Sequence, residues 1–263
     1  MNPMNPMLNI AVSAARLAAR VILMHREKID RLEVVAKGRS NFLTQADQDA
    51  EFAILDTIKK TYPTHGTCSQ ESGIQEGDDY TWVIDPIDGT INFLHGHPHF
   101  GISIAVINSK QIEHGVVFDP IRDELFTASR GEGAQLNNRR IRVSRVQNLD
   151  KALVATGFSI PPSDRTESWL KTFHALMSKA SGIRRSGATN LDLAHVASNR
   201  FDGFWETSLQ PWDIAAGVIL VREAGGLVSD FEGGQDFLNS GDIVAANSVL
   251  FNNLLRVIHE RFH

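Results

Sequence analysis

Two aspartates, Asp85 and Asp88, lie close together in the stretch WVIDPIDGT, and their type and spacing could support metal chemistry. Trp82 to Ile84 form a short apolar run, which predicts a buried strand. Pro86 cannot donate a hydrogen bond to a sheet, so we expect this strand to stop there. Asp88 follows in a sequence typical of a tight turn. Two carboxylates placed in this way can face one point in space, as a hard divalent cation requires.

Three more acidic residues stand where a predicted helix begins or a predicted strand ends. Asp47 comes three residues after Thr44, a pair that is typical of a capping box and that could also aim a carboxylate into a site. Glu71 follows a short strand and, taken alone, is typical of an exposed residue. Asp213 follows Pro211, which suits the first turn of a helix, so it too can be a simple capping residue.

Taken together, these residues form a set of hard oxygen donors suited to Mg²⁺ rather than Zn²⁺, provided that the fold brings them together. The backbone amides of Gly89 and Thr90 follow the second aspartate and could bind an anion beside the metal. Spacing alone does not decide whether the set converges. Its members are Asp47, Glu71, Asp85, Asp88 and Asp213.

The histidines and the cysteine are weaker candidates. His95, His97 and His99 have irregular spacing for a structural zinc site, and we interpret them as ordinary loop residues. Cys68 is the one cysteine of the chain, so an intrachain disulfide is impossible and a reducing compartment, the cytoplasm, fits best. No base that could activate its thiol is evident nearby.

Composition limits the function classes further. The chain has 263 residues, of which 42% are hydrophobic and 22% charged, as in ordinary globular proteins. A formal charge of -5 argues against a direct, sequence-specific nucleic-acid binder. The basic clusters at residues 139–142 and 184–185 are interpreted as surface features. Because no apolar run approaches the length of about 18 residues that a span needs, we expect no membrane association.

The elements that must position the acidic residues fall into two halves. Residues 1–145 predict two helices followed by a mostly antiparallel sheet, and residues 146–263 alternate between strands and helices, which is typical of an α/β unit. We expect the site between the halves. The predicted helices cover residues 7–35, 44–62, 167–181, 191–197, 212–224 and 250–262. The predicted strands cover residues 67–70, 82–84, 102–107, 115–118, 124–128, 141–143, 152–156, 201–205, 226–230 and 243–246.

Two stretches, DPIDGTINF at residues 85–93 and WDIAAG at residues 212–217, resemble the paired signatures of the inositol monophosphatase family. The resemblance covers nearly the whole chain. Residues 184–189 and 221–230 look most like the bacterial branch known as extragenic-suppressor inositol-1-monophosphatases. This resemblance implies an α+β to α/β fold, a layered α-β-α-β-α sandwich, which agrees with the two halves described above.

The resemblance also implies residue roles. It assigns Glu71, Asp85 and the backbone carbonyl of Ile87 to a first Mg²⁺, and Asp85, Asp88 and Asp213 to a second, with a third, weaker ion near Glu71. Asp47 and Thr90 match the pair that orients the attacking water, and Glu71 is included among the catalytic residues. Substrate contacts are assigned to Asp88, Gly89, Thr90, Thr189, Glu206 and Asp213, and Lys37 matches a loop lysine near the metals. Gln210 departs from the histidine or basic residue found in some members.

The activity implied by the resemblance is Mg²⁺-dependent hydrolysis of phosphate monoesters, above all inositol 1-phosphate, by in-line attack of a metal-activated water. Fructose 1,6-bisphosphate and nucleotide 3′-phosphates are alternative substrates within the same fold. Lithium sensitivity and a homodimer are further implications. The alternative from another class is a non-catalytic role in ribosomal RNA transcription antitermination, through contacts with the Nus complex and RNA polymerase.

Overall fold

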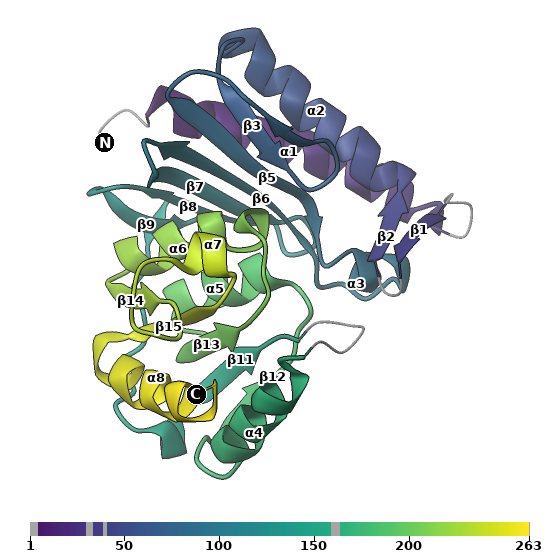
Figure 1. Cartoon of the computed structure of the whole chain (residues 1–263). Coiled ribbons are helices and arrows are strands. Elements are labelled where there is room, and N and C mark those ends of the chain that lie inside the picture. The colour runs from purple at the N-terminus through teal and green to yellow at the C-terminus, as the bar shows by residue number, and fades with distance from the viewer. Residues whose placement is uncertain (1–4, 30–33, 39–40, 159–163, 263) are drawn as a thin grey trace.

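Helices and sheets alternate in layers in the computed structural model of the chain (Figure 1). The structure describes residues 5–29, 34–38, 41–158 and 164–262, and the side chains of residues 34–43 lie outside this description. The predicted α-β-α-β-α sandwich is confirmed. Helices α1 (Pro6–Arg26) and α2 (Gln45–Thr61) form the first layer, α5 (Thr189–Ala197) and α6 (Pro211–Glu223) lie between the two large sheets, and α4 (Thr166–Met177) and α8 (Ser248–Phe262) form the last layer.

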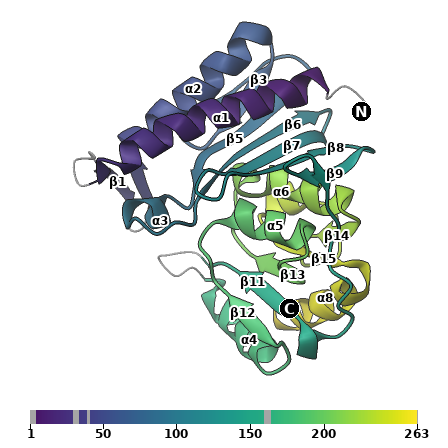
Figure 2. The same cartoon turned by 180° about the vertical axis from the view of Figure 1, so that it is seen from behind.

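The larger sheet of the described chain has eight strands in the order β10-β9-β8-β7-β6-β5-β3-β4. Only the β3–β5 pair in it is parallel, since the remaining neighbours are joined as antiparallel partners. Figure 2 shows α1 and α2 lying along one face of this sheet. The strands are β3 (Gly66–Ser69), β4 (Gly73–Gln75), β5 (Tyr80–Asp88), β6 (Gly101–Asn108), β7 (Gln111–Asp119), β8 (Glu124–Ser129), β9 (Gly133–Leu136) and β10 (Arg139–Arg140).

Both faces of the larger sheet are buried, as β5 illustrates. Successive side chains of a strand point to opposite faces. Trp82 and Ile84 belong to the core beneath α1 and α2, whereas Val83 belongs to the core beneath α5 and α6. This explains why residues 82–84 read as a continuous apolar run rather than as an alternating one. Asp85 therefore emerges from a strand that is covered on both sides.

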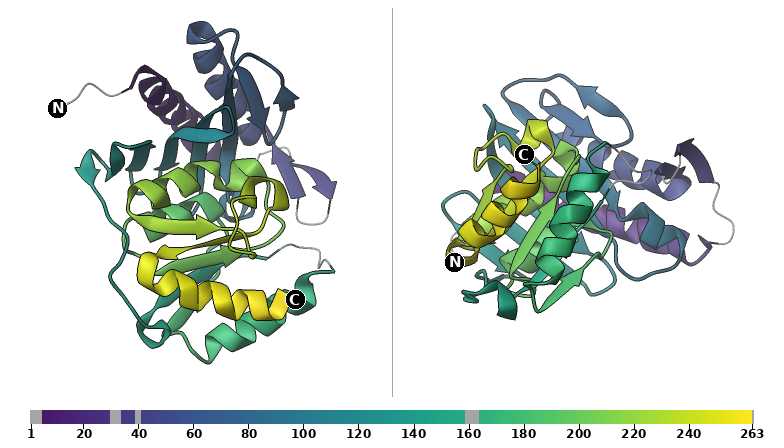
Figure 3. Two further views of the ribbon diagram at one scale, coloured as in Figure 1. Left: turned by 60° about the vertical axis from the view of Figure 1, so that its left-hand side comes forward. Right: turned by 60° about the horizontal axis from the view of Figure 1, so that its bottom comes forward.

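The smaller sheet has five strands in the order β12-β11-β13-β15-β14, and it mixes parallel and antiparallel pairs. Figure 3 shows α4 and α8 side by side on its outer face. The strands are β11 (Leu153–Thr156), β12 (Gly182–Arg184), β13 (Gly203–Glu206), β14 (Gly226–Ser229) and β15 (Ile243–Asn247), and the shorter elements of the chain are α3 (Thr90–Leu94), α7 (Phe237–Ser240) and a 3₁₀ turn at Leu149–Lys151.

Helix α6 joins the two sheets, and it is buried from Ile214 to Val221. A close approach to its neighbours depends on two glycines. A Cβ on Gly115 would lie 2.5 Å from Ile219 Cγ2, and a Cβ on Gly217 would lie 2.5 Å from Leu193 Cβ. Because the helix contacts strands of both sheets, the division at residue 145 does not coincide with a gap in packing. That boundary stays a prediction.

Three expectations about elements were wrong. The first helix ends at Arg26 and not near residue 35, since Val34–Gly38 form strand β1, which pairs with β2 (Asn41–Thr44). The basic side chains of His25 and Arg26 in the last helical turn favour an end there. The strand before Pro86 does not stop at the proline but continues to Asp88. Residues 141–143 do not form the predicted strand, since they follow β10 (Arg139–Arg140) without strand pairing. The other predicted helices and strands differ from the observed ones mainly at their ends.

Helix α1 is long and apolar enough, by length and composition, to cross a membrane. Its side chains Leu8, Ala11, Ala18 and Ile22 are buried in the core shared with α2 and the larger sheet. A core helix meets the same composition test as a membrane span. We therefore interpret α1 as the first layer of the sandwich.

Candidate active site

The two aspartates of the central motif flank an irregularity in strand β5. Asp85 pairs with Ser103 of β6 and Asp88 pairs with Gly101, and the register shifts between these two pairs. Pro86 falls in the shifted segment, where the sheet needs no hydrogen bond from the N–H group that proline lacks. The N–H of Ile87 instead donates to Asp85 Oδ1 at 3.1 Å. The shift places both carboxylates, 2% and 6% exposed, at one end of the strand.

A glycine turn follows Asp88 and begins helix α3. Gly89 has a φ of 91°, in the left-handed region where a side chain is unfavourable. A Cβ at this position would also lie 3.1 Å from the carbonyl oxygen of Gly187 and 3.2 Å from that of His99. The Thr90 hydroxyl lies 3.0 Å from the carbonyl oxygen of Ile87 and 3.4 Å from Asp47 Oδ1. The turn thus brings Thr90 to Asp47, far away in the sequence.

Asp47 has both features that its sequence position left open: it caps a helix, and its carboxylate also faces the central motif. It closes a capping box at the start of α2, because its Oδ2 accepts from the N–H of Thr44 at 2.8 Å and from the Thr44 hydroxyl at 2.6 Å. Its other oxygen faces Thr90. The side chain is fully buried, so the cap fixes the orientation of a carboxylate that also contacts the central motif.

Asp88 is held by the start of helix α5. Its oxygens accept from the N–H groups of Thr189 at 3.0 Å, Asn190 at 2.7 Å and Leu191 at 3.3 Å. The positive end of the helix dipole stabilises an anion at this position. The Thr189 hydroxyl donates in turn to Glu206 Oε2 at 2.9 Å, which links the end of β13 to the same helix start.

Asp213 lies in the first turn of α6, which begins at Pro211 as predicted. Its Oδ2 accepts from the N–H of Gln210 at 2.8 Å. The carboxyl group of Glu206, at the end of β13, lies directly against Gly157. A residue with a side chain at position 157 would clash with it. A Cβ on Gly157 would lie 1.9 Å from Glu206 Oε1.

A cavity of about 170 Å³ opens onto these residues. Asp85, Asp88 and Asp213 line it together with the Gly89–Thr90 turn and Ile87, while Asp47, Glu71, Thr189 and Glu206 are not among its lining residues. Asp47 and Thr189 are nevertheless within hydrogen-bond reach of lining residues, and Glu206 bonds to Thr189. The side chain of Lys37, in β1, lies outside the described part of the structure.

Five lining residues were not predicted from the sequence, and Ile91 and Gly187 are two of them. Gln70 and Arg185 both line the cavity. Arg185 had been interpreted as part of a surface cluster, and it is indeed exposed. Asn92 also lines the cavity, and its amide donates to the carbonyl oxygens of His99 at 2.7 Å and Ser186 at 2.9 Å. The position of Asn92 in the DGTINF motif was the one sequence signal for its role. Its contact with a segment more than ninety residues later had no signal in the sequence.

Burial raises the pKa of the acidic residues, and neighbouring charges add to this effect for Asp85 and Asp88. Burial, followed by the neighbouring charge of Asp213, raises the pKa of Asp88 to about 7. Burial raises the pKa of Asp213 to about 6, that of Asp47 to about 6 and that of Glu206 to about 8. The pKa of Asp85 is raised well above its ordinary value by burial and then by the charges of Asp88, Asp213 and Asp47. Glu71 acts on Asp47 in the same direction, so the acidic set shares one electrostatic field.

The residues present fit a divalent cation. Among the residues that the structure describes, no lysine or arginine forms an ion pair with Asp85, Asp88 or Asp213. Buried anions of one sign need a compensating charge. Within the described ranges, no group of three His, Cys, Asp or Glu side chains is arranged to hold a metal ion by itself. The fit rests instead on the uncompensated buried carboxylates, since Mg²⁺ uses few carboxylates and keeps waters and substrate phosphate oxygens as its other ligands.

Comparison with known proteins decides the family. The model of the inositol monophosphatase family matches residues 4–262. The chain belongs to the inositol monophosphatase family. It is 49% identical over 261 residues to Nus factor SuhB of Pseudomonas aeruginosa, covering 97% of this chain and 96% of that protein.

Solved structures of the family agree with this fold. Extragenic suppressor protein suhB from Bartonella henselae has a TM-score of 0.94 and 42% identity, and covers 97% of this chain and 98% of its own. The inositol monophosphatase of Thermotoga maritima has a TM-score of 0.88 and 34% identity with the same coverage. Membership of the family supports phosphatase activity and metal dependence, and the Pseudomonas aeruginosa relative is named a Nus factor.

The raised pKa values predict how stability changes with pH. A carboxyl whose pKa is higher in the folded than in the unfolded state favours folding when protonated. Its contribution is therefore complete below the unfolded value of 3.8 and is lost as the pH rises through about 6 for Asp213 and about 7 for Asp88. In EDTA, we expect the melting temperature to fall between about pH 5 and about pH 8, and Mg²⁺ to restore it most at the higher pH.

Differential scanning fluorimetry across this range measures the effect, and Asp213→Asn provides the comparison. Removing one titrating carboxyl should flatten the decline in EDTA and reduce the stabilisation by Mg²⁺. A wild-type melting temperature that rises over the range in EDTA, or Mg²⁺ stabilisation that is equal in the variant, would contradict this electrostatic account.

Proposed function

We propose that the protein is a Mg²⁺-dependent phosphomonoesterase whose main substrate is inositol 1-phosphate. The observation that carries the proposal is the set of buried carboxylates around one cavity, with no lysine or arginine of the described residues paired to its central members. We further propose that Asp85, Asp88 and Asp213, with Glu71 and the carbonyl of Ile87, hold the ions. Two or three ions per subunit would neutralise the phosphate, lower the pKa of a bound water and stabilise the leaving oxygen.

The protein's own groups would orient the reactants. The Thr90 hydroxyl lies between Asp47 and the Ile87 carbonyl. Thr90 and Asp47 can therefore together hold a water in line with the phosphorus atom. Asp47 is fixed by its capping bonds and can accept a proton near neutral pH, since its pKa is raised to about 6. The backbone amides of Gly89 and Thr90 would hold phosphate oxygens in the attack geometry.

The alcohol part of the substrate would meet Thr189 and Glu206. The hydrogen bond from Thr189 holds Glu206 in place, and the lack of a side chain at Gly157 leaves room for it. Burial raises the pKa of Glu206 to about 8, and the oxygens of its carboxyl group can accept hydrogen bonds from the hydroxyl groups of a polyol in either protonation state. This supports inositol 1-phosphate over substrates that lack neighbouring hydroxyls. Arg185, at the edge of the same cavity, adds a cation that could contact the phosphate.

Asp85→Asn should abolish Mg²⁺-dependent release of phosphate from inositol 1-phosphate while the fold survives. The asparagine cannot bridge two cations, and removing a buried charge in a repulsive cluster does not destabilise the metal-free protein. A malachite-green assay measures phosphate, and circular dichroism monitors the fold. Asp79→Asn, the same change at an exposed position, is the matched control and should keep wild-type turnover. Near-wild-type activity of Asp85→Asn would sink the proposal.

Glu206→Gln should raise KM for inositol 1-phosphate more than for p-nitrophenyl phosphate, whose leaving group has no hydroxyls to contact. Above pH 8, where Glu206 is ionised, the loss of a charge-assisted hydrogen bond predicts an increase of about tenfold. Kinetics on both substrates, together with fructose 1,6-bisphosphate and a nucleotide 3′-phosphate, measure the preference, with Li⁺ added to test inhibition. An equal change in KM for all substrates would remove Glu206 from the specificity site.

A second function is favoured by a separate observation, the 49% identity to Nus factor SuhB. We propose that this chain also takes part in ribosomal RNA antitermination, as a cytoplasmic homodimer that contacts the Nus complex or RNA polymerase. Because Asp85 is buried, a substitution there leaves the outer surface intact. Asp85→Asn should therefore still support an antitermination reporter in cells that lack the native protein. A loss of the reporter signal with a folded Asp85→Asn variant would tie the second role to catalysis.

A further inference from the structure

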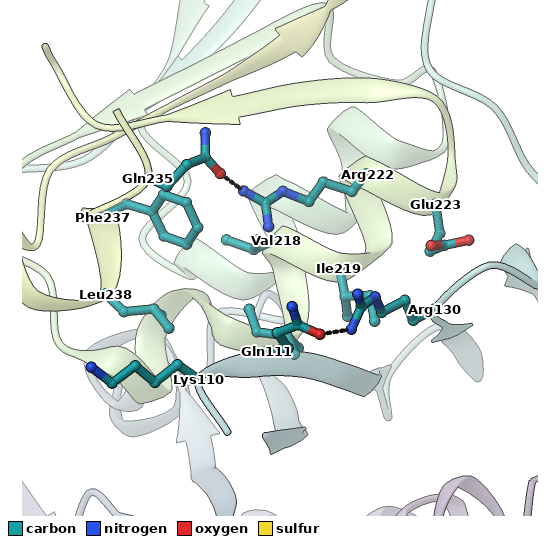
Figure 4. A pocket seen from close by; sticks show the side chains of 11 residues that line it. Lys110, Gln111, Arg130, Val218, Ile219, Arg222, Glu223, Gln235, Phe237 and Leu238 are labelled. Atoms are coloured by element: carbon teal, nitrogen blue, oxygen red, sulfur yellow. Dashed lines mark hydrogen bonds between the residues drawn. The ribbon is translucent and has the colours of Figure 1, made fainter. Parts of the chain in front are cut away.

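A second cavity, of about 410 Å³, lies at the opposite end of α6 from Asp213. Its walls come from the β6–β7 turn, the C-terminal part of α6, the segment 235–238 and Arg130 after β8 (Figure 4). It shares no lining residue with the active-site cavity. Its volume falls within the range of about 300–1,000 Å³ that is typical of small-molecule sites.

Positive side chains outnumber negative ones in this cavity. Lys110, Arg130 and Arg222 line it, and Glu223 is its one acidic lining residue within the described chain. The Glu223 carboxylate is already engaged, because its oxygens accept from the N–H groups of Gly131 and Gly133, each at 2.8 Å. The one acidic group is thus held by the backbone rather than by the cations of the cavity.

The two arginines are held by neutral glutamine side chains. Figure 4 shows Arg222 bonded to the amide oxygen of Gln235 on one side of the cavity, and Arg130 bonded to that of Gln111 on the other. Arg130 also pairs with Glu113 at 2.9 Å. Arg222 has no carboxylate partner among the described residues and lies 5.0 Å from the centre of the Phe237 ring. A glutamine orients a guanidinium without cancelling its charge.

The helix dipole explains the position of only one of the three basic side chains that line the cavity. Arg222 stands in the last turn of α6, where a cation offsets the negative end of the helix dipole. Lys110 comes from a different element, the β6–β7 turn, and both Ser109 and Lys110 there have positive φ values, 47° and 70°. Residues with side chains rarely adopt this conformation, because the Cβ atom crowds the backbone. The turn holds a lysine at the cavity although glycine or asparagine would suit its backbone better.

The remaining walls are apolar. Ile112, Val218, Ile219 and Phe237 line the cavity and are buried, and Leu238 is partly buried. Most of the lining of a ligand site is apolar, with a few polar groups that fix orientation. An arginine fork beside such a wall matches an anionic head group that carries a carbon body.

We propose that this cavity binds a small organic anion with a phosphate or carboxylate head group and a short apolar body. Arg222 and Lys110 contact the head group, and the Phe237 and Ile219 side chains contact the body. The site is separate from the active site, and its existence does not depend on the phosphatase assignment.

Phenylphosphonate is the probe, because it has a doubly charged head group and an apolar ring and contains no ester that a phosphatase could hydrolyse. Binding is measured in EDTA, where the metal-free acidic cluster of the active site repels anions. Methyl and amide NMR shifts locate the ligand through Ile112, Val218 and Ile219, with the Gly89 amide reporting on the active site. Benzyl alcohol tests whether the charge is needed, and citrate and inorganic phosphate test the carboxylate and the bare anion.

Wild-type protein should bind phenylphosphonate saturably with shifts at the three methyl-bearing residues, and Arg222→Gln should bind about tenfold more weakly. Arg142→Gln removes the same charge at an exposed position outside the cavity and should bind as the wild type does. Leu238→Trp, which fills the cavity and keeps every charge, should abolish binding. Absence of saturable binding, shifts confined to Gly89, or equal affinity in wild type and a folded Arg222→Gln would overturn the proposal.

Discussion

Repulsion among buried carboxylates is the constraint on which the centre of this protein depends. Asp85 and Asp88 are almost fully buried beside Asp213, and each is made harder to ionise by its neighbours. Backbone N–H groups offset part of this cost, from Ile87 for Asp85, from the start of α5 for Asp88 and from Gln210 for Asp213. These donors orient the acids without supplying a full positive charge. The cluster is therefore an unfavourable arrangement that a divalent cation, bound as proposed, would make favourable.

The sandwich builds this cluster by ending several elements at one place. Strand β5 contributes two aspartates because its register shifts at Pro86, and helices α5 and α6 both begin beside them. Helix α6 can reach the larger sheet because Gly115 leaves room for Ile219. The site is thus formed jointly by both sheets and by the helix layer between them, and packing at a distance from the carboxylates sets their separation.

The two functions proposed for this chain, phosphatase activity and a role in antitermination, have different support. Membership of the inositol monophosphatase family supports phosphatase activity, while the relative with 49% identity is a Nus factor. Asp85 and Asp88, the central metal ligands proposed here, lie inside the molecule, whereas a protein partner contacts the outside. Chemistry at the cavity and recognition at the surface can therefore be retained or lost separately in such a chain.

The sequence by itself determined the family, the layered fold and the identity of the acidic residues, because these depend on local motifs and on apolar periodicity. DPIDGT and WDIAAG carry their signal within a few residues. The tertiary structure alone decided which candidates converge: that Asp47 both caps α2 and faces Thr90, that Asn92 and Arg185 line the cavity, and that β5 continues past Pro86. Those facts depend on contacts between segments far apart in the chain, and on a register shift between β5 and the neighbouring strand β6.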